Sequence, residues 1–273
     1  MNQSLTLAYG SYHVPELIRQ FYELDRQLES EGLPMGLIGL RPVYDYFGYF
    51  ITPPDLIPFA DTGGDGIHFG FLTDFGRAER LETAPIVCVT PTNDPPIRLI
   101  ARNIREFFDL ACSVPYVEDL EQWWSCQDEM AMKQRTEEWI AETPSRIRKQ
   151  REEVFRRLRS AFGAVERDVY TYMRQVLRER EQQIALPTMD GLGVLGTKTG
   201  LRRYEFSFQP PDEQEWSRMR EFLVNAQTEQ KLAFIRDAFF RFILPDDTAA
   251  AELVRELMLS LGLRDEAARK FEL

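Results

Sequence analysis

The segment from Tyr49 to Gly76, YFITPPDLIPFADTGGDGIHFGFLTDFG, constrains the fold of this chain more than any other part of the sequence. Its proline pair and its DTGGDG stretch predict turns, because proline fixes φ and glycine permits a positive φ. Ile67, Phe69 and Phe71 then fall on every second position, and a period of two residues is typical of a β-strand. The segment therefore predicts a tight turn that leads into an aromatic strand.

Helices and further strands are predicted on both sides of this segment. An apolar stripe at Leu17 and every third or fourth residue after it predicts a helix over residues 14–30. Short β-branched runs predict strands at residues 85–90 and 97–100. Asn103 is a suitable N-cap for a helix that continues to Ala111.

The second half of the chain has a helical pattern. Apolar spacings of three and four residues predict one long helix over residues 145–184. A β-hairpin is predicted near residues 192–208, where LGVLG and RYEFSF flank TKTG. Asp212, Thr228 and Asp247 are suitable N-caps for three closing helices.

These elements predict an α+β fold, with a mainly antiparallel sheet flanked by helices and a largely helical C-terminal region that contains one hairpin. The change in character after Cys112 predicts a first module over residues 1–115 and a second region over residues 116–273. A single continuous domain is the alternative.

Charge and cysteine usage restrict the class of partner. The net charge is −11, and residues 1–112 contain 8 Arg, 15 Asp or Glu and no Lys. Such a surface repels nucleic acid and suits a basic protein partner, although the charge also serves solubility alone. Three cysteines without a CxxC motif argue against a zinc site or a disulfide framework and favour the cytoplasm. We see no signal peptide and no membrane-spanning run.

The residues that could carry chemistry cluster around the DTGGDG turn. They are Asp61, Thr62, Asp65, His68 and Asp74. Glycine amides can cradle a phosphate and paired carboxylates can hold a divalent cation, but a phosphate cradle normally leads into a helix and this turn leads into a strand. An Asp–His couple also needs a nucleophile, and the sequence contains no GxSxG motif. A purely structural turn with a hydrogen-bonded histidine is the alternative interpretation.

Two other patterns are more typical of structure than of catalysis. The seven basic residues between Arg146 and Arg159 are interrupted by Glu152 and Glu153, which predicts a solvated helix face with ion pairs four residues apart rather than a nucleic-acid surface. The Trp- and Phe-rich C-terminal helices are typical of a core, or of the buried face of a subunit in a larger complex.

Three strings of the first half, PPDLIPFADTGGDGIHFGFLTD, PIVCVTP and LIARNIREFFDLAC, resemble the SMI1/KNR4-type (SUKH) superfamily. The resemblance covers about residues 45–112, and the upstream element of the family, "IP.dY..fl...NG", is not evident. It implies an α+β fold with a mainly antiparallel sheet flanked by helices. It also implies a non-enzymatic role, because many bacterial members resemble immunity proteins that bind and neutralise a toxin and fungal members act as regulatory adaptors.

We therefore expect a cytoplasmic protein-binding module without catalytic residues, metal or cofactor. The expected partner is a protein, with a basic toxin as one candidate, and the expected binding residues are the five around the turn. Nucleic acid and membranes are not expected partners. The rival hypothesis is a metal-assisted hydrolase that uses Asp61, Asp65 and His68.

Overall fold

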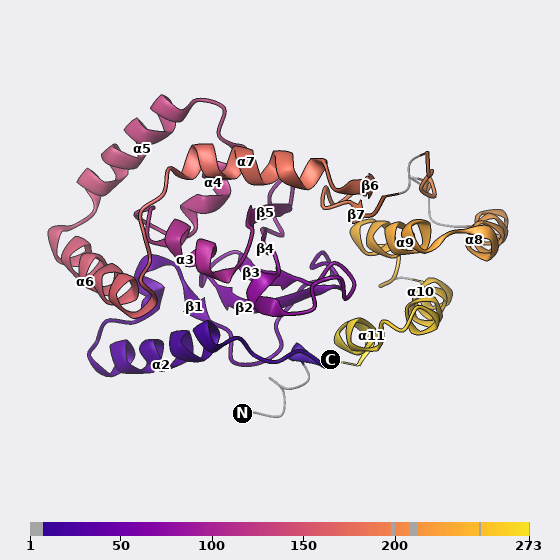
Figure 1. The fold of residues 1–273 in the computed structure, drawn as a ribbon, viewed down its shortest axis with the longest axis horizontal. Helices are drawn as coiled ribbons and strands as arrows, with labels where there is room; N and C mark the ends of the chain where they lie inside the picture. Colours follow the sequence, from indigo (N-terminus) through magenta and orange to yellow (C-terminus); the bar gives the residue numbers. More distant parts are fainter. Residues whose placement is uncertain (1–7, 198–199, 208–211, 246, 273) are drawn as a thin grey trace.

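The computed structural model describes residues 8–197, 200–207, 212–245 and 247–272. Five strands form an antiparallel sheet in which each strand pairs with the next along the chain (Figure 1). They are β1 (Arg41–Pro42), β2 (Leu56–Asp61), β3 (His68–Leu72), β4 (Ile86–Val89) and β5 (Ile97–Ala101). Every residue of β3, β4 and β5 is buried. The strands predicted from the alternation at Ile67 and from the β-branched runs are confirmed.

Helices pack around this sheet. Along the chain up to residue 181 these are α2 (Glu16–Ser30), η1 (Met35–Ile38), η2 (Leu81–Thr83), α3 (Ile104–Ala111), α4 (Asp119–Ser125), α5 (Glu129–Glu142), α6 (Ser145–Phe162) and α7 (Val169–Glu181). β5 contacts α3, α4 and α7, whereas β1 contacts α2. The predicted helices over residues 14–30 and 103–111 are confirmed, and the Asn103 side chain accepts a hydrogen bond from the Glu106 N–H at 2.9 Å.

The prediction of one helix over residues 145–184 is wrong, because the chain breaks between α6 and α7. Gly163 ends α6 in a left-handed conformation with φ 61°, and the side chain of Asp168 caps the start of α7. The apolar stripe continues across the break in both helices, but Val165 lies in the linker and is 56% exposed.

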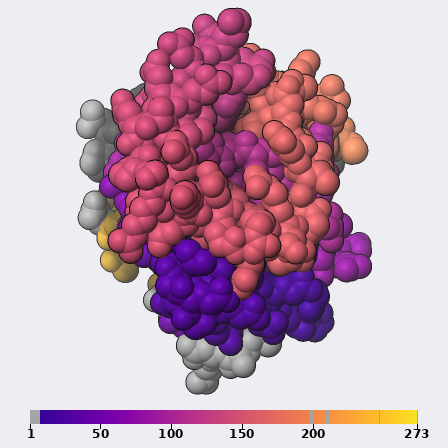
Figure 2. Space-filling model, turned by 90° about the vertical axis from the view of Figure 1, so that its left-hand side faces the viewer, coloured from indigo at the N-terminus to yellow at the C-terminus, as the bar shows by residue number. Residues whose placement is uncertain are grey.

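A hollow of about 570 Å³ lies between α5 and the segment that leads into α7 (Figure 2).

The C-terminal region contains one hairpin, and its strands differ from the predicted ones. β6 (Ile184–Leu186) pairs with β7 (Val194–Leu195), so the first arm precedes the predicted segment. Tyr204 and Phe206 lie outside any strand and pack instead against Phe234. Their alternation therefore reflects packing against a helix, and residues 198–199 and 208 of the prediction lie outside the described residues.

Helices α8 (Glu213–Asn225), α9 (Thr228–Phe240), α10 (Thr248–Ser260) and α11 (Arg264–Phe271) gather at one end of the molecule, with α5 and α6 at the other (Figure 1). Asp212 and Asp247 cap α8 and α10 as predicted. Gln227, rather than Thr228, caps α9. Helix α11 was not predicted, because it has only 8 residues and follows α10 after a single tight turn.

Buried apolar residues form two cores. The first joins the sheet to α2, α3, α4, α6 and α7, and the second joins α8–α11 to the β6–β7 hairpin. The boundary predicted near residue 115 does not separate these cores, because α6 and α7 bury their apolar stripes in the first one. Among the described helices, none combines the length and apolar character needed to cross a bilayer.

Candidate functional site

The turn between β2 and β3 holds three of the predicted binding residues. Asp61 pairs with His68 across the two strands, and its carboxylate lies 2.6 Å from a guanidinium nitrogen of Arg41. The Thr62 N–H donates to the Ile67 carbonyl at 3.0 Å and closes the turn. Asp65 stands at its exposed tip with φ 49°, in the left-handed region that aspartate tolerates.

His68 is fully buried behind this turn and supports it. Its Nδ1 lies 2.8 Å from the Gly66 carbonyl, and its Nε2 lies 3.0 Å from the hydroxyl of Thr52. Because the Gly66 carbonyl can only accept, Nδ1 carries the imidazole proton and Nε2 accepts from the Thr52 hydroxyl, whose oxygen in turn accepts from the Tyr49 N–H at 2.8 Å. Burial lowers the pKa of His68 to about 4, and the ring is neutral at physiological pH.

This arrangement gives no support to a metal site at the turn. Both nitrogens of His68 are engaged by Gly66 and Thr52, and Asp61 is held by Arg41. Among the described residues, no group of three histidine, cysteine, aspartate or glutamate side chains is arranged to hold a metal ion. Burial also raises the pKa of the Cys112 thiol to about 12, so that thiol is not an activated nucleophile.

Two adjacent exposed aromatic side chains lie near the turn in sequence; the Tyr49 ring packs on the turn, and the Phe50 ring lies beside Phe242, with ring centroids 6.5 Å apart. Tyr49 is 44% exposed and Phe50 47% exposed. The Tyr49 ring lies so close to Gly66 that a Cβ at that position would be 2.7 Å from ring atoms. With φ 71° as well, Gly66 is the residue that lets the turn and the ring pack together. Large exposed aromatic side chains are typical of interface centres.

Carboxylates also lie near the turn. Burial, then the charges of Glu121 and Asp65, raise the pKa of Glu118. Burial and the neighbouring Glu118 raise the pKa of Asp119 to about 6. In the part of the chain that the structure describes, neither Asp65 nor Glu118 has an ion-pair partner. The face around the turn, which we call the turn face (Tyr49, Phe50, Asp65 and Glu118), therefore combines apolar rings with two carboxylates that have no ion-pair partner among the described residues. Lys270 places one ammonium group beside it, where it donates to the Tyr49 carbonyl at 3.1 Å.

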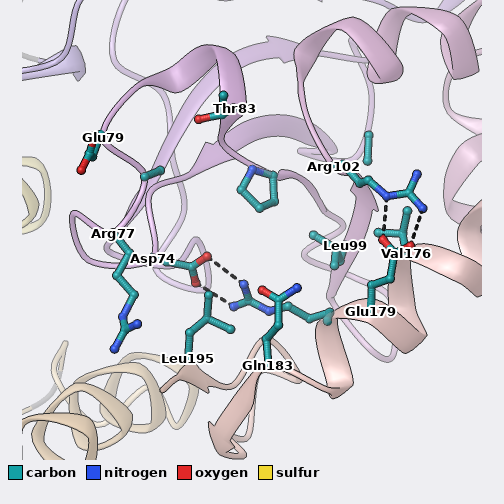
Figure 3. Close-up of a pocket in the computed structure, with 14 residues that line it drawn as sticks. Asp74, Arg77, Glu79, Thr83, Leu99, Arg102, Val176, Glu179, Gln183 and Leu195 are labelled. Atoms are coloured by element: carbon teal, nitrogen blue, oxygen red, sulfur yellow. Dashed lines mark hydrogen bonds and ion pairs between the residues drawn. The ribbon is translucent and has the colours of Figure 1, made fainter. Parts of the chain in front are cut away.

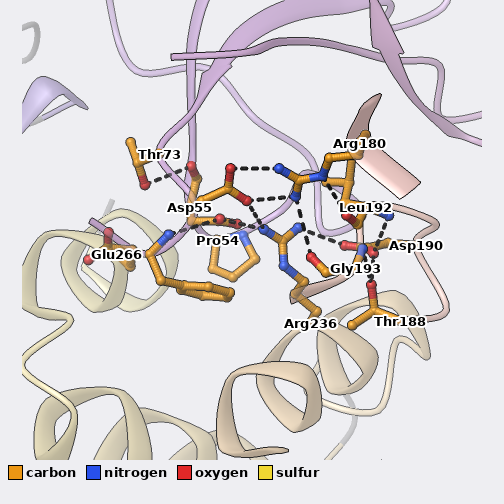
Figure 4. Close-up of polar contacts among 12 residues, drawn as sticks. Pro54, Asp55, Thr73, Arg180, Thr188, Asp190, Leu192, Gly193, Arg236 and Glu266 are labelled. Carbon is orange, nitrogen blue, oxygen red and sulfur yellow. Dashed lines mark hydrogen bonds and ion pairs between the residues drawn. The ribbon is translucent and has the colours of Figure 1, made fainter. Parts of the chain in front are cut away.

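Asp74, the fifth predicted residue, lies away from this face. It lies two residues beyond the far end of β3, a strand whose end residues His68 and Leu72 are about 13 Å apart. Its carboxylate is buried and forms two hydrogen bonds of 2.7 Å with Arg180 (Figure 4). The five predicted residues thus do not share one surface, because β3 places Asp74 and the turn at opposite ends.

Asp74 belongs to a buried ionic seam between the two cores, formed by Asp55, Asp74, Arg180, Asp190 and Arg236 (Figure 4). The Arg236 guanidinium is fully buried and lies 2.6 Å from Asp55, 3.1 Å from Asp190 and 3.6 Å from Asp74. Burial raises the pKa of Asp55 to about 6, against the pull of Arg236. Except for Asp74, these residues were not predicted; the sequence signal for Arg236 was an Arg–Asp pair inside the apolar helix KLAFIRDAFFRFIL.

Comparison with known proteins does not identify a family for this chain. No protein-family model matches the sequence, and no curated protein matches it significantly.

Proposed function

We propose that this protein is a non-enzymatic protein-binding module and that its turn face receives a basic protein partner. The observation that carries the proposal is the exposed Tyr49 ring, which packs against Gly66 next to Asp65, together with the charge of Asp65 that acts on Glu118. The exposed Phe50 follows Tyr49 and adds a second aromatic ring. Aromatic anchors supply binding energy at the centre of an interface. Complementary charge around them accelerates encounter and selects partners.

The electrostatics of the turn face favour a cation over an anion or a neutral ligand. The pKa of Glu118 is raised by burial and by nearby carboxylates, which means that its negative charge is poorly compensated. A lysine or arginine of a partner would remove that repulsion. The net charge of −11 adds a long-range field of the same sign.

The resemblance to the SMI1/KNR4-type superfamily supports the same class of function. The antiparallel sheet β1–β5 and its flanking helices agree with the architecture that the resemblance implies. Within that resemblance, a toxin with a basic binding surface is the partner that we propose. The role of His68 in this scheme is structural, because it holds the Gly66 carbonyl and thereby presents Asp65.

The test begins with affinity capture from the native host by the tagged full-length protein, followed by mass spectrometry. The affinity of any stoichiometric partner is then measured for three variants: Phe50→Ala, the double variant Asp65→Asn/Glu118→Gln, and the matched control Glu252→Gln/Glu256→Gln. The control residues are exposed on α10 and do not belong to the turn face.

We expect a basic partner whose affinity falls at least about tenfold with Phe50→Ala, which corresponds to about 1.4 kcal/mol. The carboxylate double variant should weaken binding and flatten its salt dependence, while the control stays within about twofold. Absence of a stoichiometric partner, or equal losses in the control and the turn-face variants, would refute the proposal.

A further inference from the structure

A second feature lies at the seam, at the end of β3 opposite the turn. A cavity of about 520 Å³ opens between the edge strand β5, the loop that follows β3, helix α7 and strand β7 (Figure 3). Its apolar lining comes from Pro85, Leu99, Ala101, Val176 and Leu195. Cavities of this volume with a largely apolar lining and a few polar groups are typical of small-molecule sites, which often occur where two structural units meet.

Two ion pairs flank the apolar lining. Arg180 pairs with Asp74 through two contacts of 2.7 Å, and Arg102 pairs with Glu179 through contacts of 2.6 and 2.9 Å (Figure 3). Both are bidentate guanidinium–carboxylate pairs, end-on for Arg180 and side-on for Arg102, and two parallel hydrogen bonds fix the orientation of each guanidinium. The charged groups of the cavity are therefore preorganised before any ligand enters.

After these pairs have formed, the arginines of the cavity still have N–H groups that donate to no acceptor in the described part of the chain. A guanidinium has five N–H groups. Arg180 directs four of them to Asp74, Leu192 and Gly193, and the side chain of Arg102 directs three to Glu179 and Glu106. Among the described residues, one N–H of Arg180 and two of Arg102 thus have no acceptor.

The rim of the cavity strengthens this surplus of donors. Arg77 is exposed at the rim and forms no ion pair among the described residues. Gln183 is also exposed there and adds an amide. The carboxylates of Asp74 and Glu179, in contrast, already accept two hydrogen bonds each from their arginines. Glu79 adds one exposed carboxylate to the rim, on the side of the cavity opposite Arg102 and Gln183 (Figure 3). Beside the arginines, a ligand group that accepts hydrogen bonds therefore fits better than one that donates them.

The loop that forms one wall is held in an uncommon conformation. Asp74, Phe75 and Gly76 are three consecutive left-handed residues, with φ of 50°, 55° and 84°. Arg180 donates hydrogen bonds to the Asp74 carboxylate, and the Arg236 guanidinium lies 4.9 Å from the centre of the Phe75 ring. Non-glycine residues in this region are strained, and such strain persists where the surroundings hold it and clusters at ligand sites. The turn places Asp74 and Arg77 together on the cavity.

We propose that this cavity binds a small molecule composed of an apolar body and one carboxylate. The body lies on the apolar lining between Leu99 and Val176, and the carboxylate accepts hydrogen bonds from Arg102, Arg180 and the rim residue Arg77. This site is independent of partner binding at the turn face, because β3 separates the two. Either activity can exist without the other.

The test uses the full-length protein and 1-anilinonaphthalene-8-sulfonate, a fluorescent probe that joins an apolar body to an anionic group, with octanoate and octylammonium as competitors. The variants are Gln183→Glu, which adds a negative charge at the exposed rim, and Arg77→Gln. Arg80→Gln is the matched control, because Arg80 is exposed on the same loop and does not line the cavity. Circular dichroism confirms that each variant is folded.

We expect one saturable probe site from which octanoate displaces the probe and octylammonium does not. Gln183→Glu should weaken both the probe and octanoate at least tenfold and Arg77→Gln at least threefold, while Arg80→Gln changes them less than twofold. The proposal is overturned by non-saturable probe binding, by equal competition from the two octyl compounds, or by folded variants that bind like the control.

Discussion

Replacement of Arg236 by methionine tests the energetic role of the buried seam. Arg236 is fully buried and is the common partner of Asp55, Asp190 and Asp74. Within the described residues, its removal leaves the Asp55 carboxylate with a single hydrogen bond of 3.2 Å, from the Phe75 N–H. Removing one partner of a buried ion pair costs about 3–5 kcal/mol, because an uncompensated charge stays in the interior. That loss is a large part of the total stability of a typical domain, about 5–15 kcal/mol.

Urea unfolding followed by tryptophan fluorescence and circular dichroism measures this loss. With a slope of about 2–3 kcal/mol per molar urea, a cost of 3–5 kcal/mol lowers the midpoint by between about 1 and 2.5 M. The signal also separates the two cores, because Trp123 lies in the first and Trp216 packs against the second. We expect the second core to unfold before the first in the variant, since the seam that joins them is broken.

A double-mutant cycle with Asp55→Asn identifies the source of the loss. The double variant removes both charges of the 2.6 Å pair, so its cost should be smaller than the sum of the two single costs by at least about 2 kcal/mol. The pKa of Asp55 is about 6 in the fold and 3.8 without burial, so its proton is held more tightly in the folded state. The Arg236→Met loss should therefore shrink as pH falls from 8 to 5. A loss below about 1 kcal/mol, or additive single costs, would refute this account of the seam.

Three further changes are predicted from local geometry. Burial lowers the pKa of His68 from 6.5 to about 4, so as pH falls the unfolded chain takes up this proton before the folded protein does. The wild-type protein should therefore lose about 3 kcal/mol of stability between pH 6.5 and 4, and a His68→Gln variant should not. Parallel pH profiles of the two proteins in urea titrations would contradict this. Gly66→Ala places a methyl group 2.7 Å from the Tyr49 ring at a residue with positive φ. The substitution should lower the free energy of unfolding by at least about 1 kcal/mol and expose the Tyr49 ring to quenchers. Unchanged stability would argue against the packing of the turn face. Asp168→Ala removes the acceptor of the Thr171 N–H at the start of α7 and should lower stability by about 1 kcal/mol in thermal unfolding, whereas Asp168→Asn should lower it less.

The parts of the fold that local signals define were predicted from the sequence. The alternation at Ile67 and Phe69 gave β3, and the side chain of Asn103 gave the start of α3. The break between α6 and α7 was missed because the apolar stripe has the same spacing on both sides of Gly163. A glycine within a helical pattern is a weak stop signal, and only the positive φ in the structure makes it a helix end.

The candidate sites could be predicted from the sequence less completely than the fold. Asp65 and His68 could be assigned to one turn, because residues close in sequence must be close in space. The partners of the seam could not be found in this way, since 106 residues separate Asp74 from Arg180 and 181 separate Asp55 from Arg236. Burial of charge is decided by tertiary packing, and nothing in the composition of either half identifies which arginine compensates which aspartate. The exposed rings of the turn face were likewise visible as residues but not as a surface.

The contacts of α11 carry a consequence for the order of folding. The Ser11 N–H and hydroxyl both donate to Asp265 at 2.7 Å, and Arg269 reaches the Ala8 carbonyl. These contacts join residues that are 254 and 261 positions apart. Closing so long a loop has an entropic cost that other contacts must compensate before these form, and long-range contacts slow folding. During synthesis from the N-terminus, the sheet and its helices have all their residues long before α11 emerges. We therefore expect α11 to dock after the sheet has formed, and until it docks the segment around Ala8 and Ser11 lacks the contacts with Asp265 and Arg269 that hold it.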